Sequence, residues 1–268
     1  MTGLVRRLFG QKNPKTRSQG SRPSEALPQQ LRLPVMPSLT YVVGDIHGCL
    51  DLYQKLEAQI MAEAAGAPVL IISVGDLVDR GPDSAGVIDH LMAPAPQGAQ
   101  RLILMGNHEQ MMLEFFEAPR ANIRWLDYGG RTTLTSYGVD ELQMGGFDLP
   151  EDQLAQKMQA LVPAEHLAWM RSLPAAIRLG DRYFISHSGI NPAKPLGAQS
   201  TRDLMWSRGI TANPPKGITV IHGHTPIEIV DLTGPYINID TGVYKSGRLS
   251  AVRLTPEAAP TRIDVSAS

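Results

Sequence analysis

Apolar residues recur along this chain in two alternating patterns, short continuous runs and runs with a four-residue period. The stretch LTYVVGD is a short apolar run, typical of a buried strand. After it, apolar residues return at Leu52, Leu56, Ile60 and Ala64, which places them on one face of a helix. Gly66 then supplies a residue that commonly ends helices. The pattern therefore predicts a strand followed by a helix that ends near Gly66.

The same strand–helix unit recurs twice more along the chain. The apolar runs are VLIISVGD and RLILMGN, and the helical stretches that follow them are SAGVIDHLM and HEQMMLEFFE. Three such units in succession predict an α/β fold whose sheet begins with parallel strands. Residues from about 117 to 173 have a helical pattern with turns, which includes PAEHLAWMRSL.

The last third of the chain has the pattern of strands. A hairpin is predicted at Gly180–Asp181, within AAIRLGDRYFISHSG. Further strands are predicted at GITVIHGH, YINIDTG and RLSAVRL. We find no internal repeat of solenoid length, so a repeat architecture is excluded.

The two ends of the chain differ in composition from the rest. Residues 1–38 are rich in Pro, Ser and Gln and hold seven basic residues against one acid, Glu25. Such a segment buries too little apolar area to offset its ordering entropy, so we predict a disordered tail. The alternative is a tail that contacts a partner or a membrane surface through LVRRLF. Residues 256–268 are predicted to be a loose C-terminal end, which leaves 39–255 as the folded domain.

Composition narrows the classes of function. The formal net charge is -1, so no overall field would attract nucleic acid, and no nucleic-acid partner is expected. The apolar runs are far shorter than the roughly 20 residues of a membrane helix, and no apolar secretory segment opens the chain. The single cysteine, Cys49, excludes intrachain disulfides and is typical of a reducing compartment. We therefore expect a cytoplasmic protein without a transmembrane segment.

Polar side chains follow five of the predicted strands, at the point where each strand ends. They are Asp45 and His47; Asp76, Asp79 and Arg80; Asn107, His108 and Glu109; His187; and His222 and His224. The carboxyl ends of parallel strands share one edge of a sheet, where α/β folds place ligands. Because one such turn could be chance but five could hardly be, we predict a functional site at this edge.

These residue types favour a site for transition-metal ions. Asp45 and His47 are two residues apart, so in extended backbone both side chains point the same way and can hold one ion. Asp76 can bridge two ions with its two oxygens. A neutral oxygen and two nitrogens come from Asn107, His187 and His224. Three nitrogens and three oxygen-bearing groups suit Mn, Fe or Zn better than Ca or Mg. Two divalent ions carry +4 against -2 from the two carboxylates, so the site would suit a phosphate dianion.

The chain resembles the metallophosphoesterases. The resemblance rests on GDIHG, GDLVDRG, GNHE, HSG and GHT in this order, and it covers about residues 40–254. Within that group the chain is most similar to the phosphoprotein phosphatase family, in its bacterial and bacteriophage-lambda type. The resemblance implies an α/β/β/α sandwich of two mixed sheets flanked by helices, and it makes residues 39–255 a catalytic domain.

The resemblance also implies a role for each site residue. Asp45, His47 and Asp76 would hold the first ion, and Asp76, Asn107, His187 and His224 the second. His108 would donate a proton to the leaving oxygen, with Asp79 orienting it. Arg80 and Arg208 would hold the phosphate oxygens. The nucleophile would be a hydroxide that bridges two divalent ions, with Mn²⁺ preferred and Fe or Zn as alternatives, and it would attack phosphorus in line.

Several readings stay open. The expected substrate is phosphoserine or phosphothreonine in proteins. The alternative is a symmetrical dinucleoside tetraphosphatase, whose bacterial form has VARG and GNHD where this chain has VDRG and GNHE. A silent binding module would lack a metal ligand or His108, and none is missing. Met105 stands where the lambda type has an arginine, so its contact would be lost or would come from Arg131 or Lys245. Asp79 could instead be an ion-pair partner of Arg80, and Cys49 a packed thiol or a redox switch.

Overall fold

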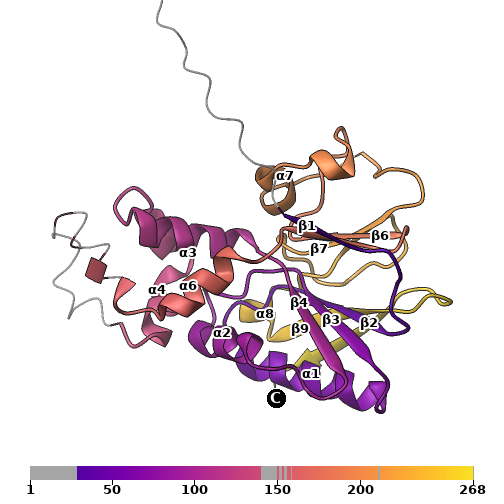
Figure 1. The fold of residues 1–268 in the computed structure, drawn as a ribbon, viewed down its shortest axis with the longest axis horizontal. Coiled ribbons are helices and arrows are strands. Elements are labelled where there is room, and N and C mark those ends of the chain that lie inside the picture. Colours follow the sequence, from indigo (N-terminus) through magenta and orange to yellow (C-terminus); the bar gives the residue numbers. More distant parts are fainter. Residues whose placement is uncertain are drawn as a thin grey trace, which may run out of the picture.

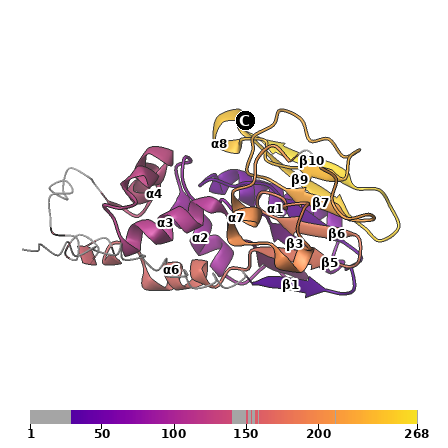
Figure 2. The same ribbon diagram turned by 90° about the horizontal axis from the view of Figure 1, so that it is seen from above.

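The computed structural model describes residues 29–139, 150, 153, 156–157, 159–210 and 212–267. The described strands form two five-stranded sheets, in the orders β10-β9-β2-β3-β4 and β1-β5-β6-β7-β8. Figure 1 shows α1 beneath the first sheet, with the second sheet above it. In the view from above, α3, α4 and α6 gather to one side of both sheets (Figure 2).

The first sheet contains the three predicted parallel strands. They are β2 (Thr40–Val43), β3 (Val69–Ser73) and β4 (Ala99–Ile103), and they pair in parallel. Strand β9 (Arg248–Leu254) joins β2 in the antiparallel sense, and β10 (Thr261–Ser266) joins β9 in the same way. The sheet is therefore mixed, as the resemblance implied.

Each predicted strand–helix unit is confirmed. The helices are α1 (Leu50–Ala64), α2 (Ser84–Met92) and α3 (Asn107–Glu117). Helix α1 ends two residues before Gly66, because Ala65 already adopts left-handed backbone with φ of 50°. The Asp83 side chain accepts a hydrogen bond from the Gly86 N–H at 2.8 Å and so caps α2.

The second sheet contains the predicted hairpin. Strand β5 (Ala176–Leu179) pairs with β6 (Tyr183–Ser186) in the antiparallel sense, across Gly180–Asp181. Strands β7 (Thr219–His222) and β8 (Tyr236–Asn238) continue the sheet in parallel with β6. This sheet is also mixed, which confirms the predicted fold class.

The remaining described elements are short helices. They are η1 (Ile123–Tyr128), α4 (Gly130–Ser136), α6 (Ala164–Arg171), η2 (Leu196–Ala198), α7 (Thr201–Met205) and α8 (Val243–Ser246). The helical pattern predicted for 117–173 is confirmed where the structure describes it, and residues 140–149, 151–152, 154–155 and 158 lie outside the described part. Among the described helices, none has the length and apolar character needed to cross a membrane.

Alternate residues of the central strands face different layers of the core. On β3, Val69 and Ile71 belong to the cluster with the helices, while Leu70 and Ile72 belong to the cluster with the second sheet. On β6, Phe184 packs on the outer side with Leu204 and Met205 of α7. Because side chains alternate along a strand, each sheet is apolar on both faces. The layers are therefore helices, sheet, sheet and helix.

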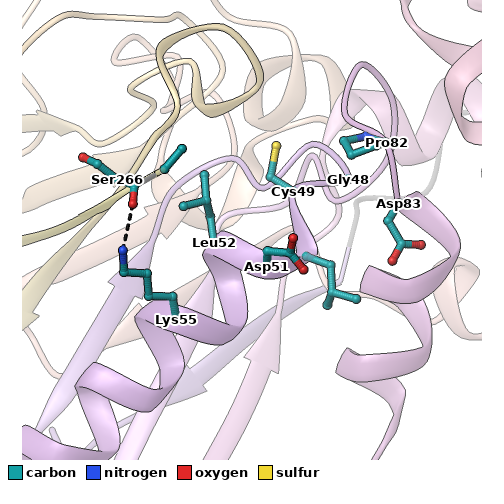
Figure 3. A pocket seen from close by; sticks show the side chains of 10 residues that line it. Gly48, Cys49, Asp51, Leu52, Lys55, Pro82, Asp83 and Ser266 are labelled. Atoms are coloured by element: carbon teal, nitrogen blue, oxygen red, sulfur yellow. Dashed lines mark hydrogen bonds between the residues drawn. The ribbon is translucent and has the colours of Figure 1, made fainter.

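Two boundary predictions are wrong. Within 1–38, predicted to be disordered, Gln30–Leu33 form β1, which pairs in parallel with β5. Within 256–268, predicted to be loose, Thr261–Ser266 form β10, and Lys55 of α1 donates to the Ser266 carbonyl at 2.9 Å (Figure 3). Both segments are edge strands in a polar setting, where sheet pairing outweighs composition. Residues 1–28 lie outside the described part, so the rest of the tail prediction is not addressed.

Candidate metal centre and active site

The ends of the parallel strands meet at one edge, as predicted. Asp45, Asp76 and Asn107 follow β2, β3 and β4 of the first sheet, and His187 and His224 follow β6 and β7 of the second. All five side chains are buried. The backbone is strained here: of six described non-glycine residues with positive φ, five lie at this edge, namely His47, Asp76, Asp79, Arg80 and His224. Such strain gathers at functional sites.

Glu109 fixes the two central turns to each other, a role that the sequence reasoning missed. Its carboxylate accepts the N–H groups of Asp76, Leu77 and Val78 at 2.7–3.2 Å, and that of Gly106 at 2.8 Å. The last of these bonds is half of a capping box at the start of α3. A glutamate three residues after Gly106, at the start of a helix, was the signal that could have identified it.

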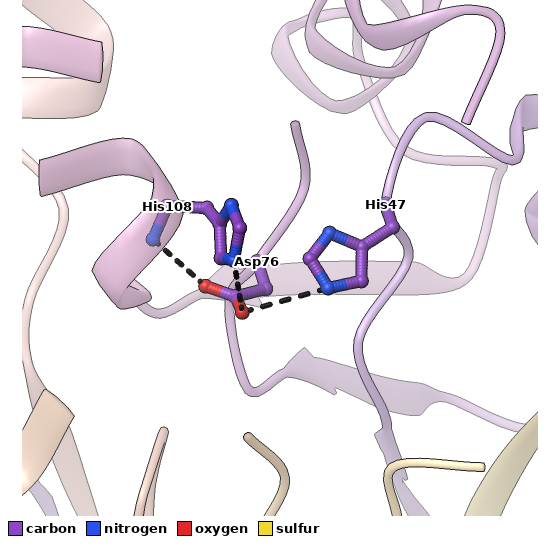
Figure 4. Close-up of side chains that lie close together, drawn as sticks. All are labelled: His47, Asp76 and His108. Atoms are coloured by element: carbon purple, nitrogen blue, oxygen red, sulfur yellow. Dashed lines mark hydrogen bonds and ion pairs between the residues drawn. The ribbon is translucent and has the colours of Figure 1, made fainter. Parts of the chain in front are cut away.

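One group of possible metal ligands comprises His47, Asp76 and His108, which converge in Figure 4. Asp76 Oδ2 lies 3.6 Å from His47 Nε2 and 3.8 Å from His108 Nε2. His47 Nδ1 bonds the Val78 carbonyl at 2.8 Å, which leaves Nε2 with its lone pair toward the site. Burial lowers the pKa of His47 to about 3, so the ring is neutral, the form that binds metals.

A second group comprises Asp76, His187 and His224, with Asn107 among them. Asn107 Oδ1 lies 2.9 Å from His187 Nε2 and 2.7 Å from His224 Nδ1. Asp76 Oδ1 lies 3.3 Å from His187 Nε2. Asp76 thus takes part in both groups, one oxygen in each, which is the position that a bridging ligand would need.

The second group fits a cation on chemical grounds. His187 Nδ1 lies 3.1 Å from the Val74 carbonyl and donates to it, which turns Nε2 toward two oxygens, Asn107 Oδ1 and Asp76 Oδ1. Burial lowers the pKa of His224 to about 3, and the neighbouring His187 acts in the same direction. Nitrogen and oxygen atoms that converge in this way in a buried site could hold a positive ion between them.

Asp45 lies beside both groups without belonging to either. Its carboxylate accepts the backbone N–H of His224 at 3.1 Å. It also packs so closely on Gly223 that a Cβ there would lie 1.9 Å from Oδ1. Burial raises the pKa of Asp45 well above its usual range, and the nearby charges of Asp240 and Asp76 add to the effect. A cation at this carboxylate would relieve both costs.

His108 and Asp79 form the predicted pair. His108 Nδ1 lies 2.6 Å from Asp79 Oδ2, which also accepts from Trp125 Nε1 at 2.8 Å. The Thr133 hydroxyl donates to Asp79 Oδ1 at 2.7 Å. Burial lowers the pKa of His108, but the Asp76 charge and the bond to Asp79 outweigh it, so the pKa is raised. The contacts of Asp79 therefore favour pairing with His108 over a simple ion pair with Arg80.

Arg80 lies across the mouth of the first group. Its Nη1 is 2.8 Å from His47 Nε2, and its Cζ is 4.7 Å from the centre of the Tyr244 ring. Tyr244 is half-exposed and stands 5.3 Å from the His47 ring, a contact that the sequence reasoning missed. Arg208 is exposed, and its charge contributes to the lowered pKa of His224, which places it near the second group.

Met105 and Cys49 stand beside motif residues in the sequence. Met105 packs against the core clusters, so it offers no charge in place of the lambda-type arginine. Arg131 lies 4.0 Å from Asp127 on the surface, whereas Lys245 follows Tyr244 on α8. Burial raises the pKa of the Cys49 thiol to about 11, which favours the packed thiol over the redox switch. The hollow beside Cys49, about 440 Å³, is lined by none of the residues of the two groups (Figure 3).

Comparison with known proteins agrees with this geometry. The family described as calcineurin-like phosphoesterase matches residues 39–249. Serine/threonine-protein phosphatase 1 of Salmonella typhimurium is 30% identical over 224 residues, which cover 80% of this chain and 91% of that protein. The asymmetrical bis(5'-nucleosyl)-tetraphosphatase PrpE of Bacillus cereus is 25% identical over 236 residues, which cover 79% of this chain and 89% of that protein.

A solved structure supports the fold. The protein described as "a putative diadenosine tetraphosphatase" superposes with a TM-score of 0.61 at 21% identity, covering 88% of this chain and 98% of that chain. At that identity the likeness concerns the fold alone. The family match, however, spans most of the chain, and it is joined by a relative at 30% identity. The chain therefore belongs to the calcineurin-like phosphoesterases and is a metallophosphoesterase, a hydrolase.

Proposed function

We propose that this metallophosphoesterase is a phosphomonoesterase that removes phosphate from phosphoserine and phosphothreonine in proteins, using two divalent ions. The observation that carries the proposal is the pair of buried ligand groups that share Asp76. The family depends on two metal ions, and these groups could hold them. The first ion would be bound by Asp45, His47 and Asp76, and the second by Asp76, Asn107, His187 and His224.

The chemistry of the donors favours Mn²⁺, with Fe or Zn as alternatives. Neutral imidazoles combined with carboxylate and amide oxygens suit such ions better than Ca²⁺ or Mg²⁺. When bound, the ions would supply the positive charge that lowers the pKa of an attacking water and polarises the phosphoryl group.

His108 would act as the acid that protonates the leaving oxygen of the ester. Its Nδ1 is held by Asp79, so Nε2 is the atom that would give the proton. Trp125 and Thr133 in turn hold Asp79, which keeps the ring from rotating. Because alkoxides are poor leaving groups, esters of serine and threonine would depend strongly on this proton.

Two arginines would bind the phosphate. Arg80 lies 2.8 Å from His47 of the first group, and the charge of Arg208 acts on His224 of the second, so both arginines could reach a phosphate bound at the two groups. Guanidinium groups bind phosphate oxygens through paired N–H donors. A dianion would thus meet two ions and two arginines, which favours phosphomonoesters over neutral esters.

The neighbouring surface supports an extended substrate. A hollow of about 370 Å³ beside the second group is lined by Trp206, Gln110, Thr201 and Arg202. Another of about 380 Å³ beside the first group is lined in part by Pro226, Ile227 and Tyr244. A peptide extends on both sides of its phosphorylated residue, so it would use both hollows. The proposed compartment for this reaction is the cytoplasm, as predicted from the sequence.

The second candidate is hydrolysis of dinucleoside polyphosphates. It is favoured by the relative of Bacillus cereus, whose name specifies the asymmetrical type, whereas the sequence reasoning considered the symmetrical type. The relative with higher identity is named a serine/threonine-protein phosphatase, and the chain has VDRG and GNHE. We therefore rank the protein phosphatase first.

A side-by-side assay tests this ranking. The Mn²⁺-loaded protein is given a phosphothreonine peptide and, separately, diadenosine tetraphosphate at equal concentration, with chelator-treated protein as control. Faster phosphate release from the peptide is the expected result. Preferential cleavage of the nucleotide would overturn the ranking, and the products would define the type: two molecules of ADP for symmetrical cleavage, ATP and AMP for asymmetrical cleavage.

A further inference from the structure

A sixth parallel strand ends at the same edge with an acid that was not among the predicted site residues. Strand β8 is parallel to β7, and Asp240 follows it by two residues. The backbone before Asp240 runs against the turn after β2, since a Cβ on Gly44 would lie 2.3 Å from the Ile239 carbonyl oxygen. Asp240 and Asp45 therefore follow their strands at neighbouring positions of this edge.

The side chain of Asp240 is buried and only half satisfied. It is 1% exposed, and its Oδ1 accepts the N–H of Gly242 at 2.8 Å. Its Oδ2 is buried and has no hydrogen-bond partner. A buried carboxylate oxygen without a donor is strongly unfavourable unless a cation is close by.

Other buried acids add to this cost. The charge of Asp76 raises the pKa of Asp240, and the charge of Asp240 raises that of Asp45, while His187 and Arg80 act on Asp240 in the opposite direction. Asp79 and Glu109 bond to His108 and to backbone N–H groups, so Asp45, Asp76 and Asp240 are the acids at this edge whose charges are left to the metal centre, with a combined charge of -3 when ionised. Two divalent ions carry +4, so the three acids would nearly neutralise them and leave the small positive excess that a phosphate needs.

We propose that Asp240 is a third carboxylate of the metal centre, and that its unpartnered oxygen helps to bind the ion on the Asp45 side. This inference rests on the proposed two-ion site and adds one residue to it. The other role for Asp240 is purely local, because accepting the N–H two residues ahead stabilises the turn at Gly242.

The chain offers a matched control for that local role. Asp231 makes the same kind of turn, since its Oδ1 accepts the Thr233 N–H at 2.9 Å, but it lies on the surface. Replacing each aspartate by asparagine keeps the acceptor oxygen and removes only the charge. Asp240→Asn and Asp231→Asn therefore differ in whether the lost charge belonged to the metal centre.

The test measures metal retention by the full-length, Mn²⁺-loaded protein against rising chelator concentration. Wild type and Asp231→Asn should retain two ions per chain over the same range. Asp240→Asn should release one ion at about 10–100-fold lower chelator, the size of effect found for residues that support metal ligands. Identical release from Asp240→Asn and wild type would overturn the inference.

Thermal unfolding gives a second readout that a turn residue would not reproduce. In chelator, the thermal unfolding midpoint of Asp240→Asn should equal or exceed that of wild type, because the variant lacks one of three like charges. Adding Mn²⁺ should raise the midpoint of the variant by less than it raises that of wild type. If the midpoint of Asp240→Asn falls below that of wild type by the same amount with and without Mn²⁺, Asp240 only stabilises its turn, and the inference is overturned. If the variant fails to fold, Asp240→Ser keeps an acceptor for Gly242 and takes its place. A wild type that retains no Mn²⁺ would instead refute the two-ion site itself.

Discussion

Two clusters of ionisable side chains in the described part of the protein differ in how their charges are matched. One links Glu57 of α1, His90 of α2 and Arg101 of β4. Arg101 donates from Nε and Nη2 to the two oxygens of Glu57, both at 2.7 Å, and from Nη1 to the His90 carbonyl at 2.8 Å. His90 Nε2 lies 2.8 Å from Glu57. Acid meets base here, and the polar atoms have partners.

The edge of the sheets has the opposite character. Asp45, Asp76 and Asp240 are buried near one another, and His224 Nε2 and Asp240 Oδ2 have no hydrogen-bond partner. Burial raises the pKa of Asp45 and Asp240, whereas Arg101 and His90 overcome the effect of burial and hold the pKa of Glu57 below its usual range. A matched cluster stabilises the fold by itself, while an unmatched one is completed by a ligand. The following experiments separate the two.

The largest effect is expected from Asp76→Asn. Asp76 contributes an oxygen to each ligand group, so its loss should weaken both ion sites at once. Turnover should fall by more than about 100-fold, because even residues that only support ligands cost about 10–100-fold. Phosphate release and bound Mn²⁺ are measured together. Activity near that of wild type would contradict the assignment of a shared ligand.

His108→Asn should lower the rate without removing the ions. General acids contribute about 10²–10⁴-fold, so esters with alkoxide leaving groups should slow by that factor and activated aryl esters by less. Retention of Mn²⁺ should stay at two ions per chain. His108 also lies within reach of an ion beside His47 and Asp76, so loss of Mn²⁺ from this variant would instead make it a ligand.

Glu57→Gln tests the matched cluster. Removing one partner of a buried ion pair leaves Arg101 uncompensated, and such changes cost about 3–5 kcal/mol. Urea unfolding should show a loss of about 3 kcal/mol, with Mn²⁺ retention unchanged. Glu63→Gln on the exposed face of the same helix is the control, expected to cost less than about 1 kcal/mol. A loss of Mn²⁺ from Glu57→Gln would remove the contrast between the clusters.

The contribution of Glu57 should also depend on pH with a definite sign. The pKa of Glu57 is lowered in the folded protein, so its stabilisation is fully present above the ordinary glutamate pKa of about 4.3. It is lost as pH falls through that value toward the lower folded pKa. The gap in unfolding free energy between wild type and Glu57→Gln should therefore narrow from pH ~6 to pH ~3. A gap that widens on acidification would contradict the proposed pairing.

The sequence predicted most of the fold because its strongest signals are local. Apolar runs and four-residue periods defined three strand–helix units, and polar residues at strand ends located the shared edge. Strands β1 and β10 were missed because both lie in polar segments, and β1 has only four residues. Only pairing with β5 and β9 makes them strands, and that pairing is not encoded in their own residues.

The site shows the same division between local and long-range information. Motif residues such as Asp76 and His108 could be named from spacing and resemblance. The contacts of Glu109 and Tyr244 were missed because they join turns that are distant in the chain, with Glu109 binding the turn at Asp76 and Tyr244 covering Arg80. The position of Glu109 at a helix start was the one local signal. Asp240 follows a three-residue strand whose parallel pairing only the structure reveals.

The smallest effect is expected from removing residues 1–28, and here the structure corrects the experiment that composition alone would suggest. A cut at 38 would delete β1 and expose the surface that Leu31 and Leu33 cover, at a cost of about 2 kcal/mol or more. A cut at 28 keeps β1 and removes six of the seven basic residues of the tail. Turnover, Mn²⁺ retention and the unfolding midpoint should then match those of the full chain, while any binding to anionic vesicles that the tail supplies should be lost.

A fall in turnover on a small phosphoester after the cut at 28 would show that the tail takes part in catalysis. A fall that occurs only after the cut at 38 would assign the effect to β1.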